Sequence, residues 1–198
     1  PKFVQVPTAA LLSAGYAARQ RARIDRERAF GKMPAPGHPQ QVTGGGAQRV
    51  YAAAHGRTGI APDTIYAAVM DRSGNAYSAT LSDTTYDAPV IPGTGMVMSS
   101  RGQQSRLASG HPAQVAPGKR PRLTPSPALA LKDGKPFLCF GTPGGAVQTH
   151  AMLQVFVNVT QFGMPLQRAV EAQRFWSASF PNSFPAHEYF PGRLCIEE

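Results

Sequence analysis

The sequence predicts an α+β protein, with a mostly antiparallel sheet covered by helices. Two observations carry this prediction: two hairpin patterns, at residues 64–81 and 128–140, and a helical pattern that follows the second of them at 146–162. The 20 glycines and 19 prolines among 198 residues exclude a long uninterrupted helical bundle. With 42% hydrophobic and 16% charged residues, the chain has the composition of a folded protein.

The first part of the chain predicts a helix followed by a connector. Over residues 7–29, alanines and larger apolar residues run beside the arginines that lie between Arg19 and Arg28, as in an amphipathic helix. Residues 31–62 contain several prolines and a triple glycine, and their apolar residues show no helical or strand periodicity. We expect an exposed, flexible connector here, of the kind at which chains are cut.

Strands are predicted where the apolar pattern returns. The runs 64–70 and 76–81 flank a turn that contains glycine, and 95–98 reads as a further short strand. The runs 128–131 and 136–140 flank an Asp-Gly turn, which is a strong hairpin signal.

Helices are predicted after the second hairpin. The run 146–162 has a helical apolar face and ends at a glycine, and 166–175 reads as a shorter helix. Before them stands GTPGG at 141–145, between a strand and a helix. Its free N–H groups are suited to bind an anion or an oxyanion, but the segment is equally typical of a tight turn.

The net charge of +9 is concentrated in the arginines of 19–28. They are typical either of a nucleic-acid-binding patch or of the solvated face of a helix, and we favour the solvated face because no nucleic-acid-binding motif accompanies them. No apolar run is long enough to span a bilayer, so no membrane partner is expected. The histidines and the two cysteines lack metal-ligand spacing, so we expect neither a metal nor a cofactor.

The junction between Asp63 and Thr64 is a candidate catalytic feature. The connector ends directly at a threonine that begins a strand. If the Asp63–Thr64 bond were cut, Thr64 would present a hydroxyl nucleophile together with an α-amine, whose pKa of about 7.7–8.0 suits a general base. The alternative is an inert threonine, since threonine commonly begins strands.

From Thr64 onward the chain resembles the small subunit of the γ-glutamyltranspeptidases, which are N-terminal nucleophile hydrolases. Residues 1–7 look like the end of that family's large subunit. The matching stretches, in order, are DTIYAAVMDRSGN (63–75), PGTGMVM (92–98), APGKRP (116–121), GTPGG (141–145), LQVFVNV (153–159), FGM (162–164) and AVEAQRF (169–175).

The resemblance implies an αββα sandwich and a precursor that cuts itself before the nucleophile. Carried over by position, Thr64 is the nucleophile and, after cleavage, the α-amine base. Asp63 then ends the large subunit, and Gly144 and Gly145 supply the N–H groups of the oxyanion hole. Residues 1–63 are the end of the large subunit with its connector, and 64–198 are a small-subunit catalytic domain that is shorter than usual.

The substrate-binding positions implied by the resemblance depart from the family pattern. Ile65 and Tyr66 stand where a second threonine and a histidine are usual. The hydroxyl that supports the nucleophile falls in the stretch 80–83, as Thr80 or Ser82. Gln104 replaces the acid that binds the substrate's α-ammonium, and Arg101 lies nearby.

The paired serines of the family are also replaced, by Leu123 and Thr124. Since a neutral amide lacks the charge-assisted strength of a carboxylate, the mechanism transfers more directly than the γ-glutamyl specificity.

Three functions stay open. The first is a self-processing amidohydrolase or acyltransferase for γ-glutamyl amides such as glutathione, and the second is a relative acting on another amide, for which Arg101 suits an acyl group bearing a carboxylate. The third is a basic nucleic-acid-binding module. We do not favour this third function, so we expect no nucleic acid as a partner. The resemblance implies a small-molecule amide and the rest of the large subunit as partners. It also implies a periplasmic or secreted protein, and leaves a cytoplasmic one open.

Overall fold

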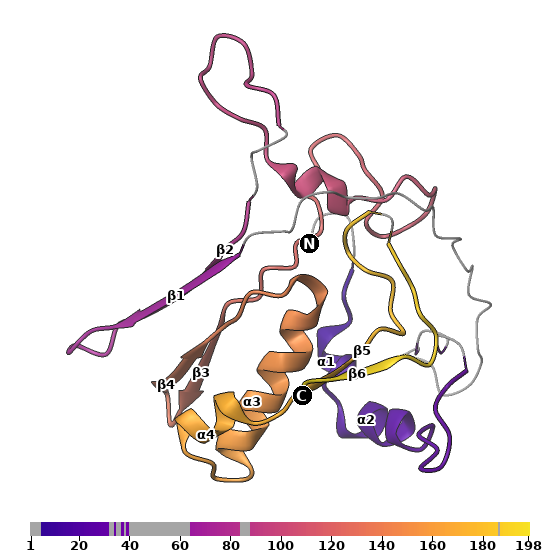
Figure 1. Ribbon diagram of the computed structural model, residues 1–198, viewed down its shortest axis with the longest axis vertical. Coiled ribbons are helices and arrows are strands. Elements are labelled where there is room, and N and C mark those ends of the chain that lie inside the picture. The colour runs from indigo at the N-terminus through magenta and orange to yellow at the C-terminus, as the bar shows by residue number, and fades with distance from the viewer. Residues whose placement is uncertain are drawn as a thin grey trace.

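The computed structural model describes residues 5–31, 34, 37, 39, 64–83, 88–185 and 187–198. These residues form an α+β structure of short helices and three separate two-stranded antiparallel sheets (Figure 1). Most of the predicted connector and all of Asp63 lie outside the described residues.

The N-terminal helix predicted over 7–29 is wrong in its length and continuity. Two helices stand there instead, α1 (Thr8–Leu11) and α2 (Ala14–Arg21). The break has a local cause: Ser13 is extended and caps α2, because its Oγ accepts the Tyr16 N–H at 3.2 Å. Beyond α2, Asp25 Oδ1 accepts the N–H of Glu27 at 2.8 Å, a side-chain turn that competes with helix.

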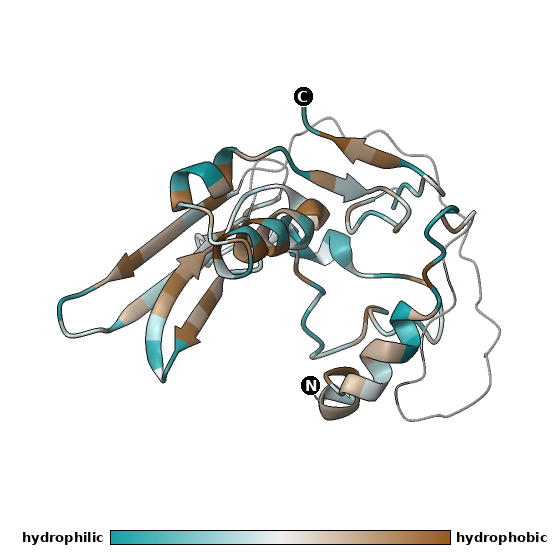
Figure 2. Ribbon diagram, turned by 90° about the horizontal axis from the view of Figure 1, so that it is seen from below, coloured by the Kyte–Doolittle hydropathy of each residue, from teal (hydrophilic) through white to brown (hydrophobic). Residues whose placement is uncertain are grey.

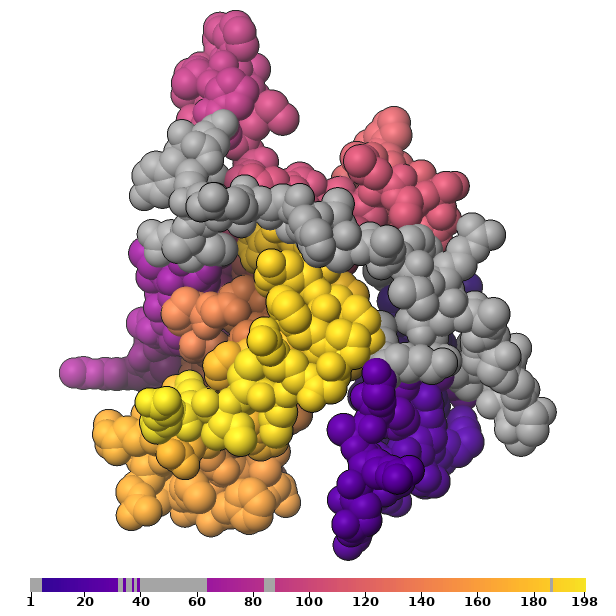
Figure 3. Space-filling view, turned by 45° about the vertical axis from the view of Figure 1, so that its right-hand side comes forward, coloured from indigo at the N-terminus to yellow at the C-terminus, as the bar shows by residue number. Residues whose placement is uncertain are grey.

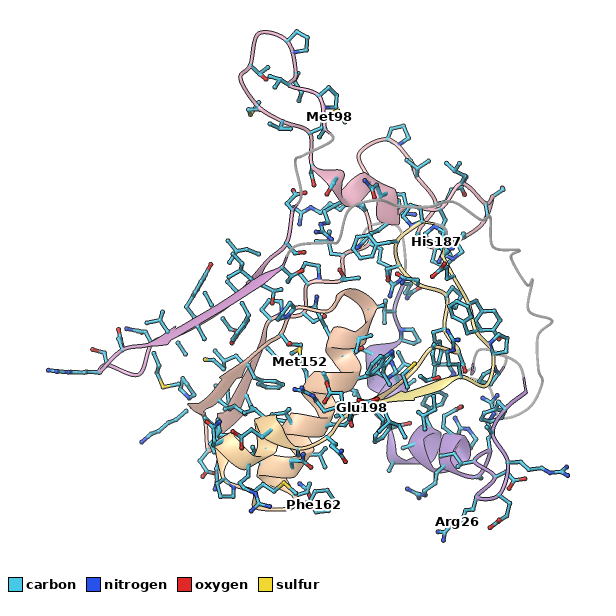
Figure 4. The ribbon with its side chains drawn as sticks, viewed as in Figure 1. Arg26, Met98, Met152, Phe162, His187 and Glu198 are labelled. Atoms are coloured by element: carbon cyan, nitrogen blue, oxygen red, sulfur yellow. The ribbon has the colours of Figure 1, made fainter. Side chains whose placement is uncertain are left out.

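The arginines of this segment are exposed, and Arg26 projects away from the body (Figure 4). This exposure agrees with a solvated surface.

The first predicted hairpin is confirmed as β1 (Ile65–Met70) paired with β2 (Ala76–Leu81). Its turn is held by Asp71, whose Oδ1 accepts the N–H groups of Ser73 at 2.9 Å and Asn75 at 2.8 Å. The far end of the hairpin extends well beyond the rest of the molecule (Figures 1 and 3).

The second hairpin is also confirmed, as β3 (Ala128–Lys132) and β4 (Lys135–Phe140). Asp133 (φ 53°) and Gly134 (φ 75°) both occupy the left-handed region, as a two-residue hairpin turn requires. The two hairpins are joined by Ser78, whose Oγ donates to the Ala128 carbonyl at 2.9 Å.

The helix predicted after β4 is confirmed with a later start. It begins as the 3-10 turn η2 (Gly145–Val147) and continues as α3 (Gln148–Thr160). Phe140 of β4 stacks on Phe156 of α3 with ring centroids 5.3 Å apart, which packs α3 against the second hairpin. Met152, one turn earlier on α3, is buried on this side of the helix (Figure 4).

The C-terminal part differs from the prediction. Helix α4 (Leu166–Glu171) ends before residue 175, because Phe175–Ser177 forms strand β5, which pairs with β6 (Leu194–Ile196). An ion pair closes this sheet, with Arg174 Nε 2.9 Å from Glu197 Oε2. In Figure 3 the C-terminal residues cover the side of the molecule between the helical part and the N-terminal helices.

Residues 88–127 contain one helix that the sequence did not indicate and lack one predicted strand. The 3-10 helix η1 (Ser100–Gln104) is capped by Ser99, whose Oγ accepts the Arg101 N–H at 3.2 Å. The strand predicted at 95–98 is wrong, since only an isolated bridge joins Val90 and Val97.

The described residues bury little apolar surface. Met152 and Ala169 are the buried hydrophobic residues of this part of the chain, and the strands of both hairpins carry apolar residues on exposed faces (Figure 2). The α+β class is therefore as predicted, whereas the described sheets do not by themselves make the layers of an αββα sandwich.

Candidate active site

Thr64 lies immediately before β1, and its hydroxyl meets that of Ser82. In the register of the hairpin Ile65 pairs with Leu81, so Thr64 and Ser82 are the next facing positions. Thr64 Oγ1 lies 2.7 Å from Ser82 Oγ. The pairing of β1 with β2 therefore brings together two hydroxyl groups that are 18 residues apart.

Ser82, and not Thr80, makes this contact. Thr80 lies in β2 opposite Tyr66, and its Oγ1 is buried with no hydrogen-bond partner among the described residues. The Tyr66 hydroxyl instead lies 2.9 Å from Ser78 Oγ, and Ile65 is largely exposed. The structure thus resolves which hydroxyl of the 80–83 stretch lies beside Thr64.

Arg101 stands behind Ser82. It belongs to η1, is 6% exposed, and its Nη2 donates to Ser82 Oγ at 2.8 Å. Its Cζ lies 5.6 Å from the ring centroid of Phe184, a cation–π contact. The three polar side chains Thr64, Ser82 and Arg101 thus form one hydrogen-bonded row.

Charges near this row perturb each other. Burial lowers the pKa of the Arg101 guanidinium, and the negative charge of Asp83 opposes that effect. Burial raises the pKa of Asp83, but hydrogen bonds from Ser99 and Ser100 and the positive charge of Arg101 outweigh burial. The pKa of Asp83 therefore lies below its ordinary value. Asp83 and Arg101 thus each favour the charged form of the other.

Gln104 and Thr124 form a second buried pair. Gln104 is 1% exposed and Thr124 6%, and Gln104 Nε2 donates to Thr124 Oγ1 at 3.2 Å. Leu123 is 54% exposed and adds no polar group to this pair. Leu123 and Thr124 occupy the positions of the family's paired serines, and of these two it is Thr124 that contacts Gln104 in the described structure.

Gly144 and Gly145 form the turn that begins η2. Their φ values of 128° and 56° lie in the region that disfavours side chains, so the path of this turn requires glycine. Because Gly144 is the N-cap of η2 and Gly145 its first residue, their N–H groups have no intrahelical acceptor. A Cβ on Gly145 would lie 3.5 Å from Phe184, the residue that also contacts Arg101. Phe184 therefore connects the glycine turn to the row that holds Thr64.

Sequence reasoning missed two residues near these side chains. Phe184 lies in a segment without a regular element, so no local pattern indicated it. Gln148, 1% exposed at the start of α3, accepts the Ser126 N–H on Oε1 at 3.2 Å, and no sequence motif marked it.

Several buried polar atoms of these residues have no hydrogen-bond partner. In the described part of the chain they include Arg101 Nε and Nη1, Gln104 Oε1, Gln148 Nε2 and Ser183 Oγ. Since buried polar groups are usually hydrogen-bonded, each of these atoms is suited to pair with water or another polar group.

No group of three or more His, Cys, Asp or Glu side chains suited to a metal ion occurs among the residues with described positions. In the same residues, no helix is both long and apolar enough to cross a membrane.

Comparisons with known proteins agree with these features. The chain is 31% identical over 199 residues to the glutathione hydrolase proenzyme of Pseudomonas sp. (strain A14), covering 92% of this chain and 31% of that relative. It is 35% identical over 179 residues to the acylase ACY 1 proenzyme of Pseudomonas sp. (strain SE83), covering 89% of this chain and 28% of the relative. The chain thus spans less than a third of the length of these curated relatives.

The fold comparison points the same way. The structure of LmbA2991HD aligns with a TM-score of 0.80 at 34% identity, covering 98% of this chain and 34% of that one. Residues 1–195 match the family described as gamma-glutamyltranspeptidase. From the order of its motifs, its fold and these relatives, the chain belongs to the gamma-glutamyltranspeptidase family.

Proposed function

We propose that this chain is part of a precursor that cuts itself between Asp63 and Thr64. Residues 1–63 then end a large subunit, and 64–198 form the catalytic small-subunit domain. The two subunits together make the αββα sandwich. The product is an N-terminal threonine amidohydrolase or acyltransferase that acts on small-molecule amides without a metal or cofactor.

The hydrogen bond between Thr64 and Ser82 carries this proposal. An alcohol is a weak nucleophile, and a neighbouring hydrogen-bonding hydroxyl stabilises the partial negative charge that its oxygen gains as its proton is removed. Ser82 lies 2.7 Å from Thr64 Oγ1 and itself accepts a bond from the cationic Arg101 at 2.8 Å. A threonine that merely began a strand would not need this support.

Self-cleavage follows from the position of Thr64 in the uncut chain. Thr64 Oγ attacks the carbonyl carbon of Asp63, the C–N bond breaks, and the nitrogen takes up a proton, which leaves an ester. Water then hydrolyses the ester, releasing the carboxyl group of Asp63 and regenerating the Thr64 hydroxyl. The new α-amine has an ordinary pKa of about 7.7–8.0, so part of it is neutral at pH 7.

Turnover uses the same hydroxyl on an external amide. The α-amine removes the proton as Thr64 Oγ attacks, and the N–H groups of Gly144 and Gly145 stabilise the oxyanion. The leaving amine departs with that proton, and an acyl ester of Thr64 remains. Water or an acceptor amine then releases the acyl group.

Two substrate classes fit this reaction. The glutathione hydrolases among the relatives support γ-glutamyl amides, such as glutathione, as substrates of this chain. The acylase ACY 1 relative supports an amide of another kind, and the neutral Gln104 favours one whose acyl group has no ammonium. The second class is supported specifically by Gln104, because an ammonium is bound more strongly by a carboxylate than by an amide.

The test is the intact mass and N-terminal sequence of the purified full precursor. The wild type should yield a chain beginning at Thr64, and Thr64→Ala should stay uncut. Thr64→Ser, which keeps a hydroxyl nucleophile, should still be cut and serves as the matched control. An active mature protein that begins at another residue would overturn the proposal.

A further inference from the structure

A group of basic side chains lies beside the candidate active site, on residues that the proposed reaction does not use. We call it the basic cluster, and its members are Arg106, His111, Lys119, Arg122 and His187. The first four belong to residues 88–132, a stretch with six lysines and arginines and no aspartate or glutamate. Positive charge therefore dominates this part of the chain.

A loop holds three members of the basic cluster together. The Arg106 N–H donates to the Ala113 carbonyl at 2.9 Å, and the Ala113 N–H donates to His111 Nδ1 at 2.9 Å. Lys119 Nζ donates to the Pro112 carbonyl at 2.7 Å. The imidazole and the ammonium are thus fixed on the same loop as Arg106.

His187 comes to this loop from the C-terminal segment (Figure 4). Its φ of 58° is uncommon for a residue other than glycine. The conformation is held because the His187 N–H donates to the Phe184 carbonyl at 2.6 Å and Nδ1 donates to the Asn182 carbonyl at 2.9 Å. The main chain, and no carboxylate, therefore sets the orientation of this ring.

The basic cluster adjoins the candidate active site along the main chain. Arg106 follows the buried Gln104 by two residues, and Arg122 precedes the buried Thr124 by two. Because Gln104 and Thr124 are hydrogen-bonded to each other, both arginines lie next to the same point. A ligand held by these arginines would lie at the edge of the candidate site.

The members of the basic cluster repel one another. Burial lowers the pKa of Arg106, and the positive charge of Arg122 lowers it further. Burial also lowers the pKa of His111, and the positive charges of the other four members add to this effect. Like charges that are held close together are unfavourable unless an anion compensates them.

The described part of the chain supplies no such anion to the two arginines. Among the described residues, neither Arg106 nor Arg122 forms an ion pair, and neither does Glu188, the acid next to His187. A guanidinium does not lose its proton in proteins, so the repulsion between Arg106 and Arg122 persists at neutral pH. The arrangement therefore favours an anion that is bound from outside.

The number of positive charges indicates which anion fits. A carboxylate has a single negative charge, whereas the phosphoryl group of a monoester has a charge of about −1.5 to −2 at pH 7 and three acceptor oxygens. Arginine binds phosphate oxygens in pairs, and Arg122 is exposed, so a small ligand can reach it. We propose that the basic cluster binds a dianionic phosphoryl group, as inorganic phosphate or as the end of a small phosphate monoester.

The experiment titrates the full precursor with inorganic phosphate, phenyl phosphate and dimethyl phosphate by calorimetry, at constant ionic strength and about pH 8, where the first two are dianions. The tighter of the two dianions should bind at least about ten-fold more tightly than dimethyl phosphate, which has one charge. Tighter phenyl phosphate supports a monoester as ligand, and tighter inorganic phosphate supports the free ion. Equal binding of dimethyl phosphate overturns the proposal.

Substitutions locate the site. Arg106→Gln and Arg122→Gln should each weaken phosphate binding by about ten-fold or more. Arg72→Gln is the matched control, because it removes the same charge from the exposed turn of the first hairpin and should leave the affinity unchanged. An affinity that survives both substitutions in the basic cluster overturns the proposal.

Thermal unfolding separates binding from a merely structural role. Without phosphate, Arg122→Gln should not lower the melting temperature of the full precursor, because it relieves a repulsion. Phosphate should raise the melting temperature of the wild type and raise that of the variant less. A variant that is destabilised without phosphate and stabilised by phosphate as much as the wild type contradicts a binding role for Arg122.

This site does not depend on the cut before Thr64, so the two proposals fail separately. Thr64→Ala should bind phosphate as the wild type does, even though it stays uncut. A precursor that is cut and active but binds no phosphate overturns the phosphoryl site alone. Binding of duplex DNA that weakens steeply with salt and is lost in Arg122→Gln would make this surface a nucleic-acid interface and overturn the small-ligand site.

Discussion

Ser82 is the residue through which the surroundings of Thr64 act on its hydroxyl. It bonds Thr64 Oγ1 on one side and Arg101 Nη2 on the other, at 2.7 and 2.8 Å. A cation that donates to Ser82 makes the Ser82 hydroxyl a stronger donor toward Thr64, because hydrogen bonds in series polarise one another. The partial negative charge that Thr64 Oγ1 gains as its proton is removed is then stabilised by a donor that is already in place before substrate binds.

Replacing this hydroxyl should slow both reactions of Thr64. Ser82→Ala should lower kcat and the rate of self-cleavage by about ten- to a hundred-fold, because a lost buried hydrogen bond costs about 1–3 kcal/mol. Thr80→Val removes the other hydroxyl of the stretch and should have a much smaller effect. Rates of anilide hydrolysis and of precursor loss on gels measure this, and a larger effect of Thr80→Val would contradict the assignment.

A negative charge at position 104 should shift substrate specificity toward γ-glutamyl amides. Gln104→Asp supplies a carboxylate for an α-ammonium, so kcat/KM for γ-glutamyl p-nitroanilide, relative to that for pentanoyl p-nitroanilide, should rise by about ten-fold. Gln103→Asp places the same charge on the exposed neighbour of Gln104 and is the control. If the wild type already hydrolyses glutathione efficiently and Gln104→Asp brings no gain, our interpretation of this position is wrong.

Local motifs in the sequence indicated two parts of the candidate site: Thr64, by its place after the connector, and the glycine turn, by its place before a helix. The remaining candidates, such as Arg101 and Gln104, came from the family resemblance. The choice between Thr80 and Ser82 needed the strand register, since alternation puts both on one face. Phe184 joins the site through a contact with Arg101, 83 positions away in the chain, which no local pattern encodes.

Among the elements, predictions succeeded where a turn residue defined them. The Asp-Gly turn at 133–134 specified its hairpin because few other residues adopt two successive left-handed conformations. The helix over 7–29 failed at Ser13, where a capping side chain outweighs the helix propensity of the alanines around it. Strand β6 has three residues and depends on a distant partner, so its local pattern was too short to read.

The pairing of β5 with β6 should depend on pH. Hydrogen bonds from Arg174 lower the pKa of Glu197 below its ordinary value of 4.5. A lowered pKa means that the contribution to stability is present at neutral pH and is lost as the pH falls through the lowered value. In the full precursor, Glu197→Gln should therefore lower the melting temperature at pH 7, and the difference from the wild type should shrink as the pH falls below 4.5. A difference that stays constant over this range would contradict the prediction.

The arginines of α2 and the segment after it should not be needed for chemistry. Replacing Arg21 and Arg28 with Gln should leave amide hydrolysis within a few-fold, because these side chains are exposed and lie on no element of the site. DNA binding that weakens steeply with salt in the wild type, and is lost in this variant, would instead favour a nucleic-acid-binding function.

For the whole molecule, the main fact is how little apolar surface the described residues bury. Leu12, Val69 and Tyr77 are 80%, 63% and 63% exposed. With two buried hydrophobic residues among those described, this part of the chain gains little from burial, since the stabilisation is about 25 cal/mol per Å² of apolar area. The hairpins are thus suited to pack against further parts of the family's fold.

This argument predicts different behaviour for the chain alone and for the full precursor. Residues 1–198 expressed alone should bind the dye ANS strongly and unfold without a sharp transition. The full precursor should bind less dye per molecule and unfold cooperatively. Cooperative unfolding of residues 1–198 alone, with no dye binding, would contradict the prediction.

The facing of Thr64 and Ser82 across the first hairpin has one more consequence. Shifting the two strands by a single residue would set Leu81 or Asp83 opposite Thr64 and turn the serine to the other side. If cleavage before Thr64 requires Ser82, a chain with wrongly paired strands is never cut. The Thr64 nitrogen then stays in a peptide bond and cannot act as a base. Self-cleavage would then depend on correct folding, so that only molecules with correctly aligned strands become active enzyme.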